Sequence, residues 1–194
     1  MKKVLLSLVV IATTVFASQA QVSYGAKAGA NLYNFSGDDA DGFDSKIGFN
    51  VGGFVNIPVS ETFSVQPELV FSAEGAKTSI SSVDANYNMN YLNIPIMLQY
   101  NNPSGFYAEA GPQIGLLMSA KVKVDSESED VKDSFKGTNI SLGVGVGYRL
   151  PNGLGFGARY NLGLGNIVDE GDVDVKLSGF QLGVSFKFGG SSKE

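Results

Sequence analysis

Residues 140–164, with the sequence ISLGVGVGYRLPNGLGFGARYNLGL, decide the fold. Apolar residues occupy every second position from Ile140 to Leu150, with serine, glycine and arginine between them. The same alternation resumes from Leu154 to Leu164, after the turn sequence Pro151-Asn152-Gly153. A period of two is typical of a β-strand, whereas an α-helix repeats every 3.6 residues. Two such runs around a tight turn therefore predict a β-hairpin.

The alternation recurs along the chain and predicts eight strands. They cover residues 23–33, 47–57, 63–74, 88–100, 105–118, 139–150, 154–165 and 177–188. Short turns alternate with long polar connections, which cover residues 34–46, 75–87, 119–138 and 166–176. Tight turns at one end and long loops at the other are typical of an outer-membrane barrel. The expected fold class is all-β: an eight-stranded antiparallel up-and-down transmembrane β-barrel.

The first 20 residues have the features of a secretory signal peptide. Lys2 and Lys3 precede an apolar run over residues 4–16, and Ser18-Gln19-Ala20 supplies small residues for cleavage before Gln21. We therefore expect a signal peptide at residues 1–20 and a single outer-membrane β-barrel domain at residues 21–194. The expected location is the cell outer membrane.

The charged residues indicate which face of the sheet meets water. A soluble calycin-like barrel turns its apolar face inward around a ligand, whereas a membrane barrel turns it outward to lipid. All charged residues inside the predicted strands fall on the face opposite the apolar one: Lys27, Glu68, Glu74, Glu109, Arg149, Arg159 and Lys187. A soluble barrel would carry many more charges on its exterior. The pattern favours a membrane barrel with these seven side chains in its lumen.

The seven charges are expected to form a network that plugs the lumen. Arg149 and Arg159 are the only arginines in the chain, and both are predicted to point inward. Glu109 and Arg149 fall near the same rim on neighbouring strands, and Glu68 and Arg159 face each other across the ring. A guanidinium can bind a carboxylate through two hydrogen bonds, so such side chains can bridge a narrow lumen. The alternative is that each charge is hydrated separately.

Two surface features are expected at the ends of the barrel. Aromatic residues near the strand ends should form a girdle at the turn end: Phe63, Tyr100, Phe106, Tyr148, Phe186 and Phe188. Of the 19 acidic residues, 14 lie in the four long connections, which predicts a negatively charged loop end. Residues 119–137 are predicted to form the longest external loop, as a mobile segment or a frayed strand extension.

The composition excludes much chemistry. The chain has no histidine and no cysteine, so Ser-His-Asp and Cys-His catalysis and the usual zinc, haem and iron–sulfur ligands are excluded. Asp39-Ala40-Asp41-Gly42 resembles a calcium loop, but Asn50 stands where the bidentate glutamate would be needed. The net charge of −5 includes no basic tract suited to nucleic acid. We expect neither enzymatic activity nor a cofactor or metal.

Several stretches resemble the PorT-like outer-membrane β-barrel family of Bacteroidetes-type bacteria. They are SVQPELVFS at residues 64–72, GAK at 75–77, YLNIPIML at 91–98 and FYAEAGP at 106–112. The resemblance implies an integral outer-membrane barrel and, because some relatives are linked to protein secretion, an accessory secretion role as one alternative. Relatives often end on the aromatic residue of the last strand, whereas Gly189 to Glu194 follow Phe188 here.

The function expected from the sequence is a structural or surface-interaction role. The partners would be outer-membrane lipid and, through the acidic loops, envelope or surface proteins or glycans, with the chain acting as a monomer. A narrow passive channel and a soluble lipid-binding calycin-like barrel are the alternatives.

Overall fold

The computed structural model describes residues 22–38, 40–80, 83–124, 127–169 and 174–188, with only the backbone described at 79, 80, 83 and 84. The predicted signal peptide lies outside these residues and stays a prediction. The strands are β1 (Ser23–Ser36), β2 (Phe43–Pro58), β3 (Phe63–Ile80), β4 (Val83–Asn101), β5 (Phe106–Val124), β6 (Glu127–Asp130), β7 (Thr138–Arg149), β8 (Leu154–Gly163) and β9 (Lys176–Phe188). One 3₁₀ turn, η2, spans Lys132–Ser134. Among the described residues, no helix is long and apolar enough to cross a membrane.

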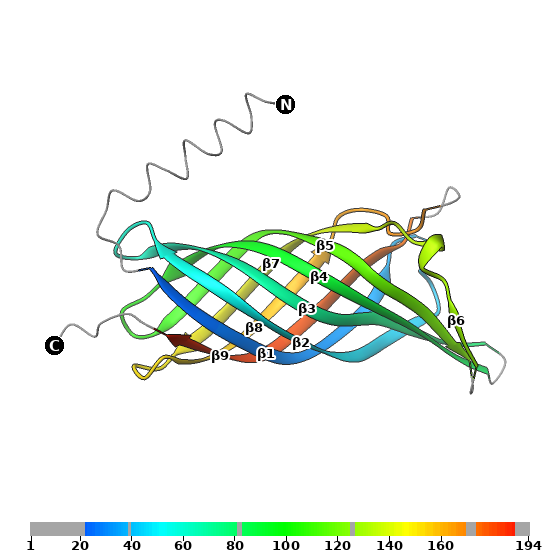
Figure 1. Ribbon diagram of the computed structural model, residues 1–194, viewed down its shortest axis with the longest axis horizontal. Coiled ribbons are helices and arrows are strands. Elements are labelled where there is room, and N and C mark those ends of the chain that lie inside the picture. Colours follow the sequence, from blue (N-terminus) through cyan, green and yellow to red (C-terminus); the bar gives the residue numbers. More distant parts are fainter. Residues whose placement is uncertain (1–21, 39, 81–82, 125–126, 170–173, 189–194) are drawn as a thin grey trace, which may run out of the picture.

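Eight of the strands form a closed barrel. Each pairs antiparallel with its neighbour in the chain, and β1 pairs with β9 from Tyr24↔Phe188 to Ser36↔Lys176, which closes the ring (Figure 1). β6 stands apart from the ring because it pairs with the far end of β5 alone among the described strands. The predicted eight-stranded antiparallel barrel is confirmed.

The hairpin predicted from residues 140–164 forms between β7 and β8. Gly153 has φ of +90°, a conformation that glycine adopts without steric cost. The backbone N–H of Gly153 donates to the carbonyl of Leu150 at 3.0 Å, and the side-chain oxygen of Asn152 accepts from the N–H of Leu154 at 3.1 Å. The turn residues thus satisfy the backbone where the chain reverses.

The strands run further toward the loop end than predicted. The prediction of a polar loop at residues 75–87 is wrong, because β3 and β4 continue in register from Gly75↔Asn88 to Ile80↔Val83. Likewise, β5 continues to Val124 and pairs with β4 and β6. These extensions project beyond the rest of the barrel (Figure 1). Alternation is weak in residues 75–80 because polar side chains, such as the exposed Lys77, replace the apolar residues of the outer face there.

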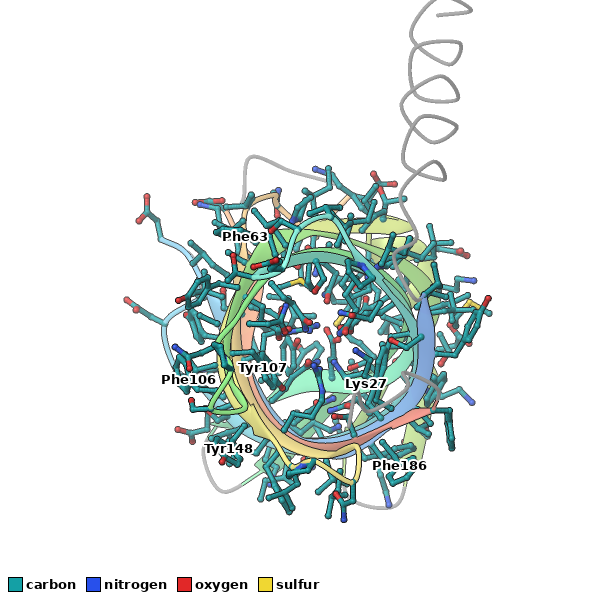
Figure 2. All side chains as sticks on the ribbon, turned by 90° about the vertical axis from the view of Figure 1, so that its left-hand side faces the viewer. Lys27, Phe63, Phe106, Tyr107, Tyr148 and Phe186 are labelled. Carbon is teal, nitrogen blue, oxygen red and sulfur yellow. The ribbon has the colours of Figure 1, made fainter. Side chains whose placement is uncertain are left out.

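Apolar side chains cover the outside of the barrel, as the charge pattern predicted. The outward-facing side chains in the middle of the ring strands form an outer apolar band, and none of them is charged. Its exposed members include Val51, Leu69, Ile96, Leu98, Ile114, Val144, Val146, Leu162, Leu182 and Val184. Four of the predicted aromatic residues, Phe63, Phe106, Tyr148 and Phe186, lie on the outside around the turn end (Figure 2). The other two, Tyr100 and Phe188, pack against Phe63 and Phe186 with ring centroids 5.5 and 5.1 Å apart. The alternative of a soluble calycin-like barrel is wrong, because its apolar face would lie inside.

The loop end of the lumen is filled by an apolar cluster. Its largest buried members are Tyr33, Phe35, Met89, Tyr91, Leu117, Ile167, Val175 and Leu177. The connection after β6 folds over this cluster, where Phe135 forms a β-bridge with Val168 and Lys136 donates its backbone N–H to Ile167 at 2.8 Å. The barrel is therefore closed at its loop end by its own connections.

Candidate functional site

The centre of the lumen is occupied by one arginine between two carboxylates. Arg159 on β8 donates from Nη1 and Nη2 to the two oxygens of Glu68 on β3, at 3.0 and 2.7 Å. Its Nε donates to Glu109 on β5 at 2.8 Å. The side chains of Glu68 and Arg159 are 0% and 5% exposed. The guanidinium thus links strands on opposite walls of the barrel in the bidentate geometry that favours arginine over lysine.

A fourth charge and several amides complete this central network. Lys27 on β1 donates to Glu68 at 2.8 Å, and the side-chain amide of Gln66 donates to the same carboxylate at 2.9 Å. Gln99 donates to Glu109 at 2.8 Å. Both carboxylates therefore accept several charge-assisted or amide hydrogen bonds, which is the condition under which buried ions are tolerated.

Glycines on β7 make room for this network. A β-carbon at Gly145 would lie 3.0 Å from Oε1 of Glu109, and one at Gly143 would lie 3.4 Å from Cδ of Arg159. One at Gly147 would overlap the ring of Tyr107. The glycine alternation that predicted the strand is therefore also what fits long side chains into a narrow barrel.

Three of the seven predicted lumenal charges lie outside the central network. Glu74 accepts a hydrogen bond from Asn93 at 2.8 Å on the loop side of the network. Lys187 donates to Asn56 at 3.2 Å near the turn end. Arg149, expected near Glu109, instead lies over the ring of Tyr107, with its Cζ 5.1 Å from the ring centroid. The carboxylate of Glu109 is occupied by Arg159, which explains why Arg149 finds an aromatic partner.

Two further groups of side chains lie in the lumen, and sequence reasoning missed the second of them. Neutral polar side chains form a layer above the network, in which Asn31 bonds Ser72 and Asn50, and Asn161 bonds the Tyr33 hydroxyl at 2.8 Å. The apolar cluster at the loop end is the second group. Its signal was present in the sequence, since Tyr33 and Phe35 continue the inward phase of β1 that begins with the polar Ser23 and Lys27.

The loop end carries both signs of charge. Exposed carboxylates of the described residues include Asp38, Asp41, Asp44, Glu127, Glu129, Asp130, Asp133 and Asp169. Exposed lysines stand among them: Lys77, Lys121, Lys123 and Lys132. Asp39 of the calcium-like motif lies outside the described residues. Among these exposed residues eight carboxylates stand against four lysines, so the loop end carries an excess of negative charge in which both signs are present.

Comparisons with known proteins agree with this geometry. The sequence matches the family described as "Outer membrane protein beta-barrel domain" over residues 16–169. Neisserial surface protein A is similar in structure, with a TM-score of 0.56 and 18% identity over 86% of this chain and 99% of that chain. At this identity the likeness shows the fold alone.

Two further solved barrels resemble the chain less closely. The Yersinia pestis attachment invasion locus protein Ail, solved in complex with the heparin analogue sucrose octasulfate, has a TM-score of 0.48 and 18% identity over 88% of this chain and 100% of that chain. OprG from Pseudomonas aeruginosa has a TM-score of 0.46 and 13% identity over 87% and 96%. A comparison with curated protein sequences found no match.

Proposed function

Because this chain belongs to the outer membrane protein β-barrel domain family, it resides in the outer membrane, and we propose that it acts there as a closed, non-enzymatic barrel whose loop end makes surface contacts. Lipid surrounds the outer apolar band. The role would be structural or adhesive, and envelope proteins, surface proteins or glycans would be the partners at the loop end.

The single observation that carries the proposal is the filling of the lumen. Arg159 joins opposite walls at mid-height, and the apolar cluster around Tyr33 and Leu177 closes the loop end above it. An eight-stranded barrel is narrow enough for side chains to fill it completely. A function that uses the lumen would require both the Arg159 contacts and the apolar cluster to move. A function of the loops requires neither to move.

Planar-bilayer recording tests the closed lumen against the channel alternative. The purified protein should insert and show no stepwise conductance above that of a protein-free bilayer. Stable single-channel openings of the unaltered chain would overturn the closed-barrel proposal and favour the narrow passive channel.

The contact surface at the loop end can be tested by site-specific crosslinking in intact cells. Ser128 in β6 is exposed on the strand extension, and Ser104 is exposed in a turn at the opposite end. A photo-reactive residue at Ser128 should give discrete adducts with protein or glycan. Ser104 serves as the control from the turn side. Lipid adducts alone from Ser128 would contradict a surface-interaction role.

A narrower proposal rests on the PorT-like resemblance of residues 64–72, 75–77, 91–98 and 106–112. It is an accessory role in protein secretion. Deleting the gene and comparing proteins in the culture medium tests it: loss of specific secreted proteins, restored by the intact gene, would support the role. An unchanged set of secreted proteins would remove it and leave the surface role untouched.

A further inference from the structure

A cavity lies in the lumen between the central network and the turn end. It is lined by Lys27, Tyr107, Glu109, Arg149, Arg159 and Gln181, among others, and Figure 2 looks into this end of the barrel with Lys27 and Tyr107 labelled. Its volume is about 50 Å³, which gives room for about three water molecules. A polar cavity of this size suits either water or one small ion.

Positive charge exceeds negative charge around this cavity. Among the described residues, the cations that reach this half of the lumen are Lys27, Arg149, Arg159 and Lys187, whereas the carboxylates are Glu68 and Glu109. The other acidic residue at this end, Glu61, is exposed in the turn after β2. The surplus of two cations has no protein counter-charge in the described part of the chain.

The surplus falls on Arg149 and Lys187. Lys27 and Arg159 already neutralise the two carboxylates. The ammonium of Lys187 donates to a neutral amide oxygen, that of Asn56. Two cations near one cavity without a carboxylate partner create a positive potential there, which is strengthened by the low dielectric of the barrel wall.

Arg149 is also short of hydrogen-bond acceptors. Its Nε is buried and has no hydrogen-bond partner among the described residues, and its guanidinium lies over the face of the Tyr107 ring. A buried donor on a charged group that finds no acceptor costs more than a neutral one. An acceptor from outside the protein, placed in the cavity, would remove this cost.

From these observations we propose that the turn-side cavity binds one small oxyanion against the guanidinium of Arg149. The planar fork of N–H groups recognises the oxygens of phosphate-like and carboxylate-like anions better than a spherical ion. Lys187 and Lys27 supply further positive charge, and the Tyr107 ring holds the guanidinium in place. The proposal is independent of any partner at the loop end.

Inorganic phosphate is the probe, and the two arginines make the test selective. A spectrum of the ¹⁵N-labelled full barrel in detergent contains two arginine Nε–Hε signals, since Arg149 and Arg159 are the only arginines. The Arg159 Nε is already bonded to Glu109. Phosphate added at constant ionic strength should shift the Arg149 signal in a saturable way and leave the Arg159 signal in place.

Variants distinguish a specific phosphate site from non-specific electrostatic attraction. Arg149→Lys keeps the charge but loses the fork and, with it, the Arg149 signal, so its phosphate affinity is compared with that of the unaltered barrel by calorimetry. The affinity should fall about tenfold or more, as expected for the loss of a charge-assisted hydrogen bond. Lys123→Met removes one positive charge from the exposed end of β5 and should leave the affinity unchanged. Chloride at the same ionic strength should not reproduce the shift.

Three results would overturn the proposal. They are an Arg149 signal that does not move with phosphate, a shift that grows linearly without saturation, and an equal shift with chloride. The titration of the unaltered protein is decisive by itself, so a variant that fails to fold does not remove the test.

Discussion

At the residue scale, Arg159 is the side chain that holds the central network of the lumen together. It is 5% exposed and contacts carboxylates from two strands that are far apart in the sequence. Taking a guanidinium out of water is costly, and the cost is recovered only where the paired groups are well placed. The two hydrogen bonds to Glu68 and the one to Glu109 meet this condition.

A double-mutant cycle on Arg159→Met and Glu68→Gln tests whether these residues act as a unit. Each single change should lower the unfolding free energy in detergent by up to about 3–5 kcal/mol, less where water enters the lumen. The interaction energy should lie at about 0.5–3 kcal/mol. The single variants should still not conduct, because the apolar cluster around Tyr33 and Leu177 closes the loop end. Lys123→Met is the exposed control. Additive effects on the unfolding free energy would mean that each charge is hydrated separately.

At the scale of the strand, the glycines of β7 decide whether the network fits. Gly145→Val places a branched side chain against the backbone carbonyl of Ala158 and the Glu109 carboxylate, where even a β-carbon would lie 2.8 Å from the carbonyl oxygen and 3.0 Å from Oε1. We expect a loss of about 1–3 kcal/mol in unfolding free energy, typical of overpacking. Ala110→Val is the matched control, because Ala110 faces outward on the neighbouring strand β5. Equal losses of unfolding free energy in the two variants would mean that the β-propensity of valine, and not the limited space in the lumen, causes the effect.

The strands also show how far the sequence predicts this fold. Alternation predicted the ring and the facing positions of Glu68 and Arg159, because a period of two fixes the face and the turns fix the height. It did not predict that β3 and β4 continue to residues 80 and 83, since the outer face there is polar, as at Lys77, and only the inner face, with Ala76 and Tyr87, packs on the apolar cluster. Alternation also did not predict the contact of Arg149 with the Tyr107 ring. That contact depends on which cation bonds the Glu109 carboxylate, and side-chain geometry rather than the pattern of residues decides this.

A further strand-scale prediction concerns residues 119–137. Lys121, Lys123 and Lys132 are exposed on or next to the β5–β6 extension, whereas Phe135 is anchored to Val168. Trypsin added to intact cells should cut first at these lysines, as judged by mass spectrometry of the fragments. A chain in which the three are glutamine should resist the same treatment. Cleavage that requires access from the periplasm would place the loop end inside the cell envelope and reverse the proposed orientation.

At the scale of the whole molecule, lipid takes the part that a hydrophobic core plays in a water-soluble domain. The outer apolar band has no protein partner, and exposing apolar surface to water costs about 25 cal/mol per Å². Val184→Arg places a charge near the middle of the band on β9 and should destabilise the barrel in lipid by about 2–4 kcal/mol. Val59→Arg, in the turn after β2, should cost at most about 1 kcal/mol. Equal costs, measured by denaturant unfolding in vesicles, would contradict this position of the bilayer.

The pairing of β1 with β9 has a consequence for assembly. All other ring contacts join ring strands that follow one another in the sequence, with β6 and η2 between β5 and β7, so hairpins can form while the rest of the chain is still unstructured. The β1–β9 seam joins the two ends of the described chain and forms only when the final strand has arrived. Until then the edge strands have unpaired backbone groups, which can pair with a strand of another chain. Contacts so distant in sequence are slow to form, so the interval before closure is the period in which this protein most needs a chaperone.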